Sequence, residues 1–170
     1  MATLTGDYLE LRPLPERDLP ALLKVYQGTP LYFEALGRST ASLALADVRA
    51  QWEAARTTPG RTLFGAYHTV TGLLIGAAEV TIGTPEPGAA AVWLLIWGGF
   101  QRQGYGQECL ALLVGWLAES HPGVESLWAI AAANPEGRAF LELQGFAATD
   151  ARAPSPVGGG ETFWMRLAQP

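Results

Sequence analysis

In the first part of the chain, the spacing of apolar residues predicts one strand followed by several helices. Residues 8–12 alternate apolar and polar, which predicts a strand with one buried face. Helical spacing of apolar residues then predicts a helix capped by Asp18 and ending at Gly28, a short helix that begins at Thr29, and a third over residues 42–56. Three helical pieces therefore follow one strand.

The middle of the chain changes to strand character. Residues 62–68, 73–82 and 89–97 predict three successive strands, and the short turns between them favour antiparallel neighbours. The third strand is apolar on both faces, so we expect it at the centre of the sheet, covered on both sides. It runs into the glycine-rich stretch 98–106, and a strong amphipathic helix follows that stretch.

The last part of the chain returns to mixed elements. Residues 124–131 predict another strand, and a helix capped by Asn134 ends at Gly145. Residues 146–151 and 161–167 predict a final strand pair around a loop rich in proline and glycine.

Together these elements predict a single α/β (α+β) domain. Its core is a mixed central β-sheet of about seven strands flanked by helices. A chain of 170 residues has the size of one compact domain, and no linker long enough to separate two domains interrupts it. We therefore expect one domain over residues 1–170.

Charge narrows the classes of partner. Acidic residues outnumber basic ones by 16 to 11, and the net charge of −5 argues against nucleic acid or an anionic membrane as a partner. The longest apolar runs are shorter than the roughly 20 residues that cross a bilayer. The N-terminus lacks the pattern of a secretory signal, so we expect a cytoplasmic protein.

Scarce residue types exclude several kinds of site. Cys109 is the only cysteine, which rules out an internal disulfide and a zinc site built on cysteine pairs. His68 and His121 are far apart and show no metal-binding spacing, so we expect no metal.

The segment 101–106 carries the clearest chemistry. A buried strand that opens through glycines into a helix presents unpaired N–H groups and the positive end of the helix dipole to an anion. A P-loop is excluded, because Tyr105 and Gly106 stand where lysine and serine or threonine are required. The match to the glycine fingerprint of dinucleotide-binding folds is weak, because Cys109 occupies the position of the third glycine.

The six residues Gln-Arg-Gln-Gly-Tyr-Gly at 101–106 resemble the pyrophosphate loop of the GNAT superfamily of acyl-CoA-dependent N-acetyltransferases. Residues 134–146, a capped helix that ends in Gly-Phe, resemble the second signature of that family. Residues 11–14 and the acidic turn after them resemble the opening of the ribosomal-protein alanine acetyltransferase branch. The resemblance covers essentially the whole chain in the right order.

This resemblance implies an acetyl-CoA site where two central strands, residues 89–97 and 124–131, splay apart. The pantetheine arm would lie between them and pair with the main chain near Leu94 and Ile96. The N–H of Leu94 would polarise the thioester carbonyl and hold a developing oxyanion. The other implied cofactor-binding residues are those of the loop and of the helix after it: Gln101, Arg102, Gln103, Gly104, Gly106, Gln107, Asn134 and Phe140.

The implied reaction moves an acetyl group to a primary amine, on a protein N-terminus or a small molecule, by direct transfer. The strand 89–97 lacks the glutamate that many relatives use as a base, and Leu141 replaces a tyrosine that protonates the leaving thiolate. Glu79 is the first candidate base, because it interrupts an apolar strand, and Glu34 is the second. The alternative is a catalytically inactive module that binds acyl-CoA. The oligomeric state is open, with a homodimer as one option.

Overall fold

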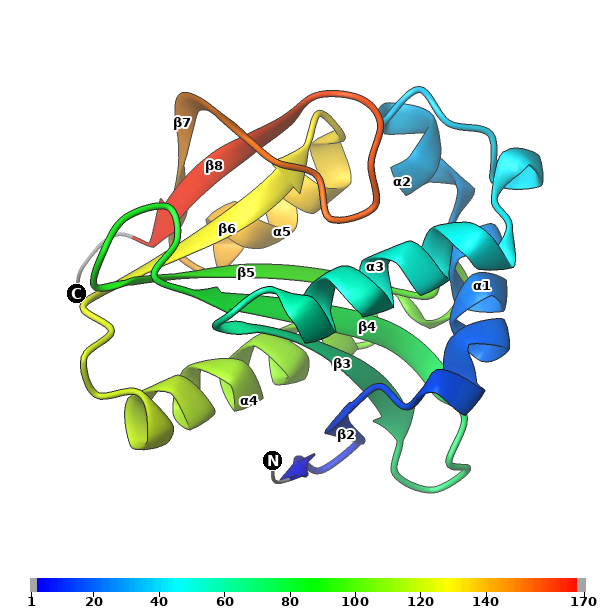
Figure 1. Ribbon diagram of the computed structural model, residues 1–170, viewed down its shortest axis with the longest axis horizontal. Coiled ribbons are helices and arrows are strands. Elements are labelled where there is room, and N and C mark those ends of the chain that lie inside the picture. The colour runs from blue at the N-terminus through cyan, green and yellow to red at the C-terminus, as the bar shows by residue number, and fades with distance from the viewer. Residues whose placement is uncertain (1–2, 168–170) are drawn as a thin grey trace.

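The computed structural model describes residues 3–167, which form one eight-stranded sheet with helices on both faces (Figure 1). Its elements in chain order are β1 (Leu4–Thr5), β2 (Leu9–Pro13), η1 (Glu16–Asp18), α1 (Leu19–Gln27), α2 (Pro30–Ala35), η2 (Thr40–Ser42), α3 (Leu45–Thr57), β3 (Arg61–His68), β4 (Leu74–Ile82), β5 (Ala89–Ile96), η3 (Gly98–Phe100), α4 (Tyr105–Ser120), β6 (Ser126–Ala132), α5 (Pro135–Leu143), β7 (Phe146–Ala153) and β8 (Thr162–Leu167). The labels η1 to η3 denote 3₁₀ helices.

The strand order is β1-β2-β3-β4-β5-β6-β8-β7. The pair β5–β6 is parallel and the other neighbours in the described sheet are antiparallel, so the sheet is mixed, as the sequence predicts. The predicted meander of three strands is confirmed as β3, β4 and β5. The strand beyond the expected seven is β1, which is only two residues long.

Side-chain alternation on β5 divides the core into two layers. Ala90 and Val92 pack with α4 and α5 on one face, whereas Trp93 and Leu95 pack with α1, α2 and α3 on the other. Figure 1 shows α3 crossing in front of the central strands. The prediction that this strand is central and covered on both sides is confirmed.

Two local expectations differ from the structure. The helix expected over residues 42–56 begins instead at Leu45, because Oδ2 of Asp47 accepts a hydrogen bond from the N–H of Ala44 at 2.8 Å and starts the helix there. Asp18 does stand at the N-terminus of α1, but its carboxylate accepts from the Tyr67 hydroxyl at 2.5 Å and makes no capping bond.

Candidate functional site

The two central strands separate halfway along their length. Pairing between β5 and β6 runs from Ala89–Ser126 to Val92–Ala129 and stops there. Beyond that point β5 continues to pair with β4, and β6 continues to pair with β8. The sheet therefore opens between the second halves of β5 and β6, as the family resemblance implies.

Main-chain groups of β5 face this opening. The N–H of Trp97 donates to the carbonyl of Ile75 on the β4 side at 2.7 Å. Directions alternate along a strand, so the N–H groups of Leu94 and Ile96 point the other way, toward β6. The carbonyl of Ile96 accepts from Nε2 of Gln101 at 2.8 Å. Gln101 thus fixes the end of β5 to the loop that follows it.

The loop between β5 and α4 presents a row of main-chain donors. Arg102 has φ 61° and Gly104 has φ 87°, both in the left-handed region, so the chain turns sharply before α4. The first hydrogen bond into the helix runs from Glu108 N–H to the Gly104 carbonyl at 3.1 Å. Within residues 3–167, no acceptor binds the N–H groups of Arg102, Gly104, Gly106 and Gln107. This is the donor set that an anion at a helix N-terminus requires.

The remaining predicted loop residues are also positioned here. Gln103 donates from Nε2 to the Gly99 carbonyl at 3.3 Å, and its side chain is exposed with that of Arg102. A Cβ atom on Gly106 would lie 3.3 Å from Cζ of Phe140 and 3.9 Å from Cγ1 of Ile96. The ring of Phe140 therefore packs over the first turn of α4, beside the end of β5.

Helix α5 starts with the predicted cap. Oδ1 of Asn134 accepts from the N–H of Gly137 at 2.6 Å, and Pro135 follows as the first helical residue. Leu141 packs in the core cluster beneath α4 and is only 7% exposed. The cofactor-binding residues predicted from the sequence thus lie on four neighbouring elements: β5, the loop, α4 and α5.

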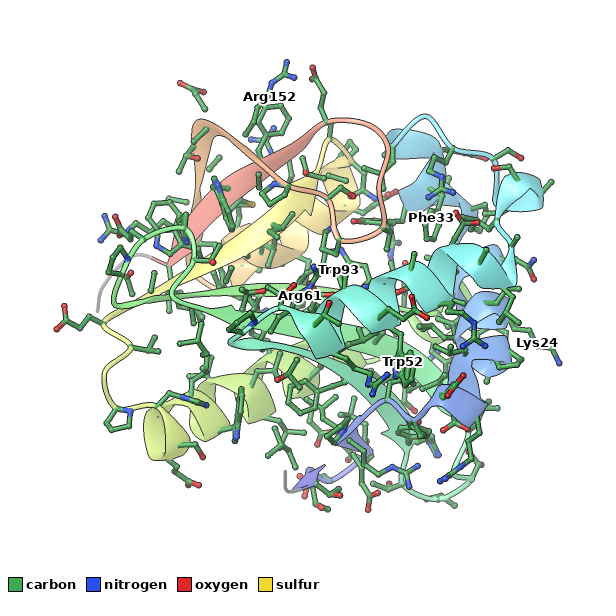
Figure 2. The ribbon with its side chains drawn as sticks, in the orientation of Figure 1. Lys24, Phe33, Trp52, Arg61, Trp93 and Arg152 are labelled. Carbon is green, nitrogen blue, oxygen red and sulfur yellow. The ribbon has the colours of Figure 1, made fainter. Side chains whose placement is uncertain are left out.

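Glu79 lies on β4, on the face that α1 and α3 cover, and is 5% exposed. Oε1 accepts from Nε of Arg61 at 2.7 Å, while Oε2 accepts from Nη2 of Arg61 at 3.1 Å and from Nε2 of Gln51 at 3.2 Å. Burial raises the pKa of Glu79 despite the arginine. Figure 2 shows Arg61 beside α3 near the centre of the molecule. These partners account for the burial of Glu79 without catalysis, and its role as a base stays a prediction. Glu34 is exposed on α2.

Two features of this region were not predicted. Nε1 of Trp93 donates to the hydroxyl of Tyr32 on α2 at 2.8 Å, and burial raises the pKa of Tyr32 to about 12. The carboxylate of Glu108 on α4 accepts the N–H groups of Asp7, at 2.6 Å, and Leu9, at 2.9 Å. Glu108 thereby fastens the start of the chain to the helix behind the loop. Both contacts join residues 61 or more positions apart, which periodicity does not report.

Solved structures with the same fold include several acetyltransferases. An acetyltransferase from Thermus thermophilus is 26% identical, with a TM-score of 0.77, and the alignment covers 97% of this chain and 98% of that one. An acetyltransferase from Agrobacterium tumefaciens is 22% identical, with a TM-score of 0.74 and coverage of 99% and 95%. RimL, a ribosomal L7/L12 alpha-N-protein acetyltransferase solved in complex with coenzyme A, is 16% identical, with a TM-score of 0.74 and coverage of 97% and 96%.

No curated protein sequence matches the chain. Among the described residues, no helix is both long enough and apolar enough to span a bilayer. The family model described as an acetyltransferase (GNAT) domain matches residues 8–147. That match spans more than half of the sequence and includes the splayed strands, the loop and α5, so the chain belongs to the GNAT family of N-acetyltransferases, which use acyl-CoA.

Proposed function

We propose that this protein transfers an acetyl group from acetyl-CoA to a primary amine by direct transfer. The observation that carries the proposal is the end of β5–β6 pairing at Val92–Ala129, which leaves the last part of β5 unpaired toward β6 where it meets the start of α4. An extended pantetheine arm fits such an opening, because the N–H groups of Leu94 and Ile96 supply the hydrogen bonds that a neighbouring strand would otherwise take.

The pyrophosphate and the thioester of acetyl-CoA would bind to different groups of the chain. N–H groups of Arg102, Gly104, Gly106 and Gln107 would bind the pyrophosphate, and the dipole of α4 favours its charge. The N–H of Leu94 would donate to the thioester carbonyl and stabilise negative charge that develops on its oxygen. Phe140 would pack against the cofactor, and Nδ2 of Asn134 stays available to it because the cap uses Oδ1.

The acceptor must present a neutral amine, because an ammonium group has no lone pair. An α-amino group has a pKa near 8 and loses its proton far more easily than a lysine side chain with a pKa near 10.4. A protein N-terminus therefore needs less help from a base than an alkylamine does. Positioning of donor and acceptor can supply much of the rate enhancement without a base.

The test follows thiol release from acetyl-CoA in the presence of a panel of tetrapeptides and small amines of graded size. Calorimetry measures coenzyme A binding in parallel. Turnover with at least one amine supports the transferase. Tight binding without turnover on any amine would instead indicate an acyl-CoA-binding module, the alternative to which buried Leu141 and a β5 strand without carboxylates point.

Glu79→Gln tests whether that carboxylate acts as a base. If it does, turnover should fall mainly at low pH, where the acceptor is protonated and must lose its proton to the enzyme. At high pH the amine is already neutral, and the variant should approach the wild-type rate. The measurement is kcat/KM for the amine between pH 6 and 9, and a profile of unaltered shape would remove Glu79 from the mechanism.

A further inference from the structure

The connection between β7 and β8 lies against the segment that follows α2 (Figure 1). A Cβ atom on Gly160 would lie 2.5 Å from Cα of Leu36, and one on Gly159 would lie 2.9 Å from Cδ of Arg38. Both glycines have positive φ, 54° and 73°. The two segments therefore meet at a distance that leaves no room for a side chain.

Arg38 bonds to both sides of this contact. Nη1 donates to the Val157 carbonyl at 2.6 Å, and Nη2 donates to Oδ1 of Asp47 at 3.1 Å. Asp47 is itself fixed at the start of α3, because its other oxygen accepts from Ala44 N–H. That backbone hydrogen bond is the main reason that the pKa of Asp47 is lowered, so the residue stays ionised as a partner for Arg38. The guanidinium thus ties the β7–β8 connection to α3.

The tied connection lies over the sheet on the face opposite α4. Val157 packs against the apolar cluster that contains Trp93, and Tyr32 and Ile130 pack against the same cluster. On the other face, the first turn of α4 and the ring of Phe140 flank the end of β5. An amine that attacks a thioester whose carbonyl is held by the Leu94 N–H would therefore arrive on the side where Val157 is held.

We propose that Arg38 is a positioning residue for the acceptor. By holding the main chain of Val157 in place, it keeps the β7–β8 connection as a fixed wall that limits the bulk beside the reacting amine. The proposal rests on the transferase function proposed above. It assigns the limit on acceptor size to an arginine that lies outside the predicted cofactor site.

Arg38→Met removes both hydrogen bonds and keeps the apolar stem of the side chain. We expect amide hydrogen exchange across residues 154–161 to accelerate at least about tenfold, since a charge-assisted bond that holds the loop is lost. We also expect the ratio of kcat/KM between the smallest and the bulkiest amine that the wild type acetylates to fall by a similar factor. The KM for acetyl-CoA should not change. General destabilisation of the fold would instead affect the acetyl-CoA site and the acceptor site together.

Arg49→Met is the matched control, because Arg49 lies on α3 and, like Arg38, forms an ion pair, but with Glu16 and between exposed side chains. Gly160→Ala is a second variant that leaves Arg38 intact but forces the connection away from Leu36, and it should reproduce the loss of discrimination. If amide hydrogen exchange across residues 154–161 is unchanged in Arg38→Met, Arg38 does not hold the β7–β8 connection. If exchange accelerates but the ratio of kcat/KM between small and bulky amines is unchanged, the connection does not limit acceptor size. A wild type that acetylates no amine refutes the proposed function and the acceptor role with it, while the exchange measurement still reports on the fastening.

Discussion

Gly106→Val is expected to weaken coenzyme A binding by about 100-fold or more. A Cβ atom at this position would stand 3.3 Å from Cζ of Phe140, and the two methyl groups of valine extend further into the same space. The ring of Phe140 must then move, or the first turn of α4 must shift and misalign its N–H groups. Losing two charge-assisted hydrogen bonds to the pyrophosphate at about 1.5 kcal/mol each gives this factor. Calorimetric titration with coenzyme A measures it.

Gly104→Val should act by a different route. Apart from its chain neighbours, no atom of residues 3–167 lies within 4 Å of a Cβ built on Gly104, but its φ of 87° is one that a β-branched residue adopts only under strain. We expect the bend before α4 to change and binding to weaken strongly here too. Gly104→Ala and Gly106→Ala serve as milder variants if valine prevents folding.

Gly115→Val is the matched control for both substitutions. It lies in α4, and a Cβ atom there would meet no described residue within 4 Å outside the backbone of its own helix. Its affinity for coenzyme A should equal that of the wild type. Unchanged affinity in a folded Gly106→Val variant would falsify the assignment of the pyrophosphate to this loop.

The order of strands and helices could be predicted because it depends on local alternation. β5 shows this most clearly, since its apolar residues on both faces indicate a central strand, and the structure covers it on both sides. The pattern of apolar residues does not predict where an element starts when a side-chain hydrogen bond to the backbone determines that start. Ser39 and Asp47 bond the backbone around residues 40–44 and divide an apolar stretch into a 3₁₀ turn and a helix that begins at Leu45.

The cofactor loop could be predicted because its chemistry lies in consecutive residues. The donors from Arg102 to Gln107 follow from a glycine-rich turn placed between a strand and a helix. The surroundings of Glu79 could not be predicted, because Arg61 reaches it only in the β3–β4 register that pairs Leu63 with Glu79. Arg38 likewise meets Val157 across 119 positions of sequence. Such pairs depend on how elements pack, which periodicity does not specify.

The ion pair between Arg61 and Glu79 lies in the core on the face of the sheet that α1 and α3 cover. The side chain of Arg61 is 19% exposed and that of Glu79 is 5% exposed. Gln51 donates to Glu79 from Nε2, and its Oε1 accepts from the Tyr26 hydroxyl at 2.5 Å. Breaking a buried pair by removing one partner is costly, because the other charge stays in the core without compensation. Arg61→Met should therefore lower the free energy of unfolding by about 3–5 kcal/mol at pH 7.

The loss in Arg61→Met should also depend on pH. Burial already raises the pKa of Glu79 above its ordinary value near 4.5, and removing the arginine raises it further. A carboxyl with a higher pKa in the folded state binds more protons there than in the unfolded state, so stability falls as pH rises through that interval. Urea unfolding at pH 5, 6, 7 and 8 should show a steeper fall for the variant than for the wild type.

Adding Glu79→Gln to Arg61→Met should remove this extra pH dependence and recover part of the stability, since a neutral amide carries no buried charge and its oxygen can still accept from Gln51. A loss in Arg61→Met that is small and equal at every pH would contradict this account. It would mean that the Glu79 carboxylate reaches water or another cation, and its candidacy as a base would gain support. The two outcomes therefore distinguish a structural carboxylate from one that can exchange protons with an acceptor.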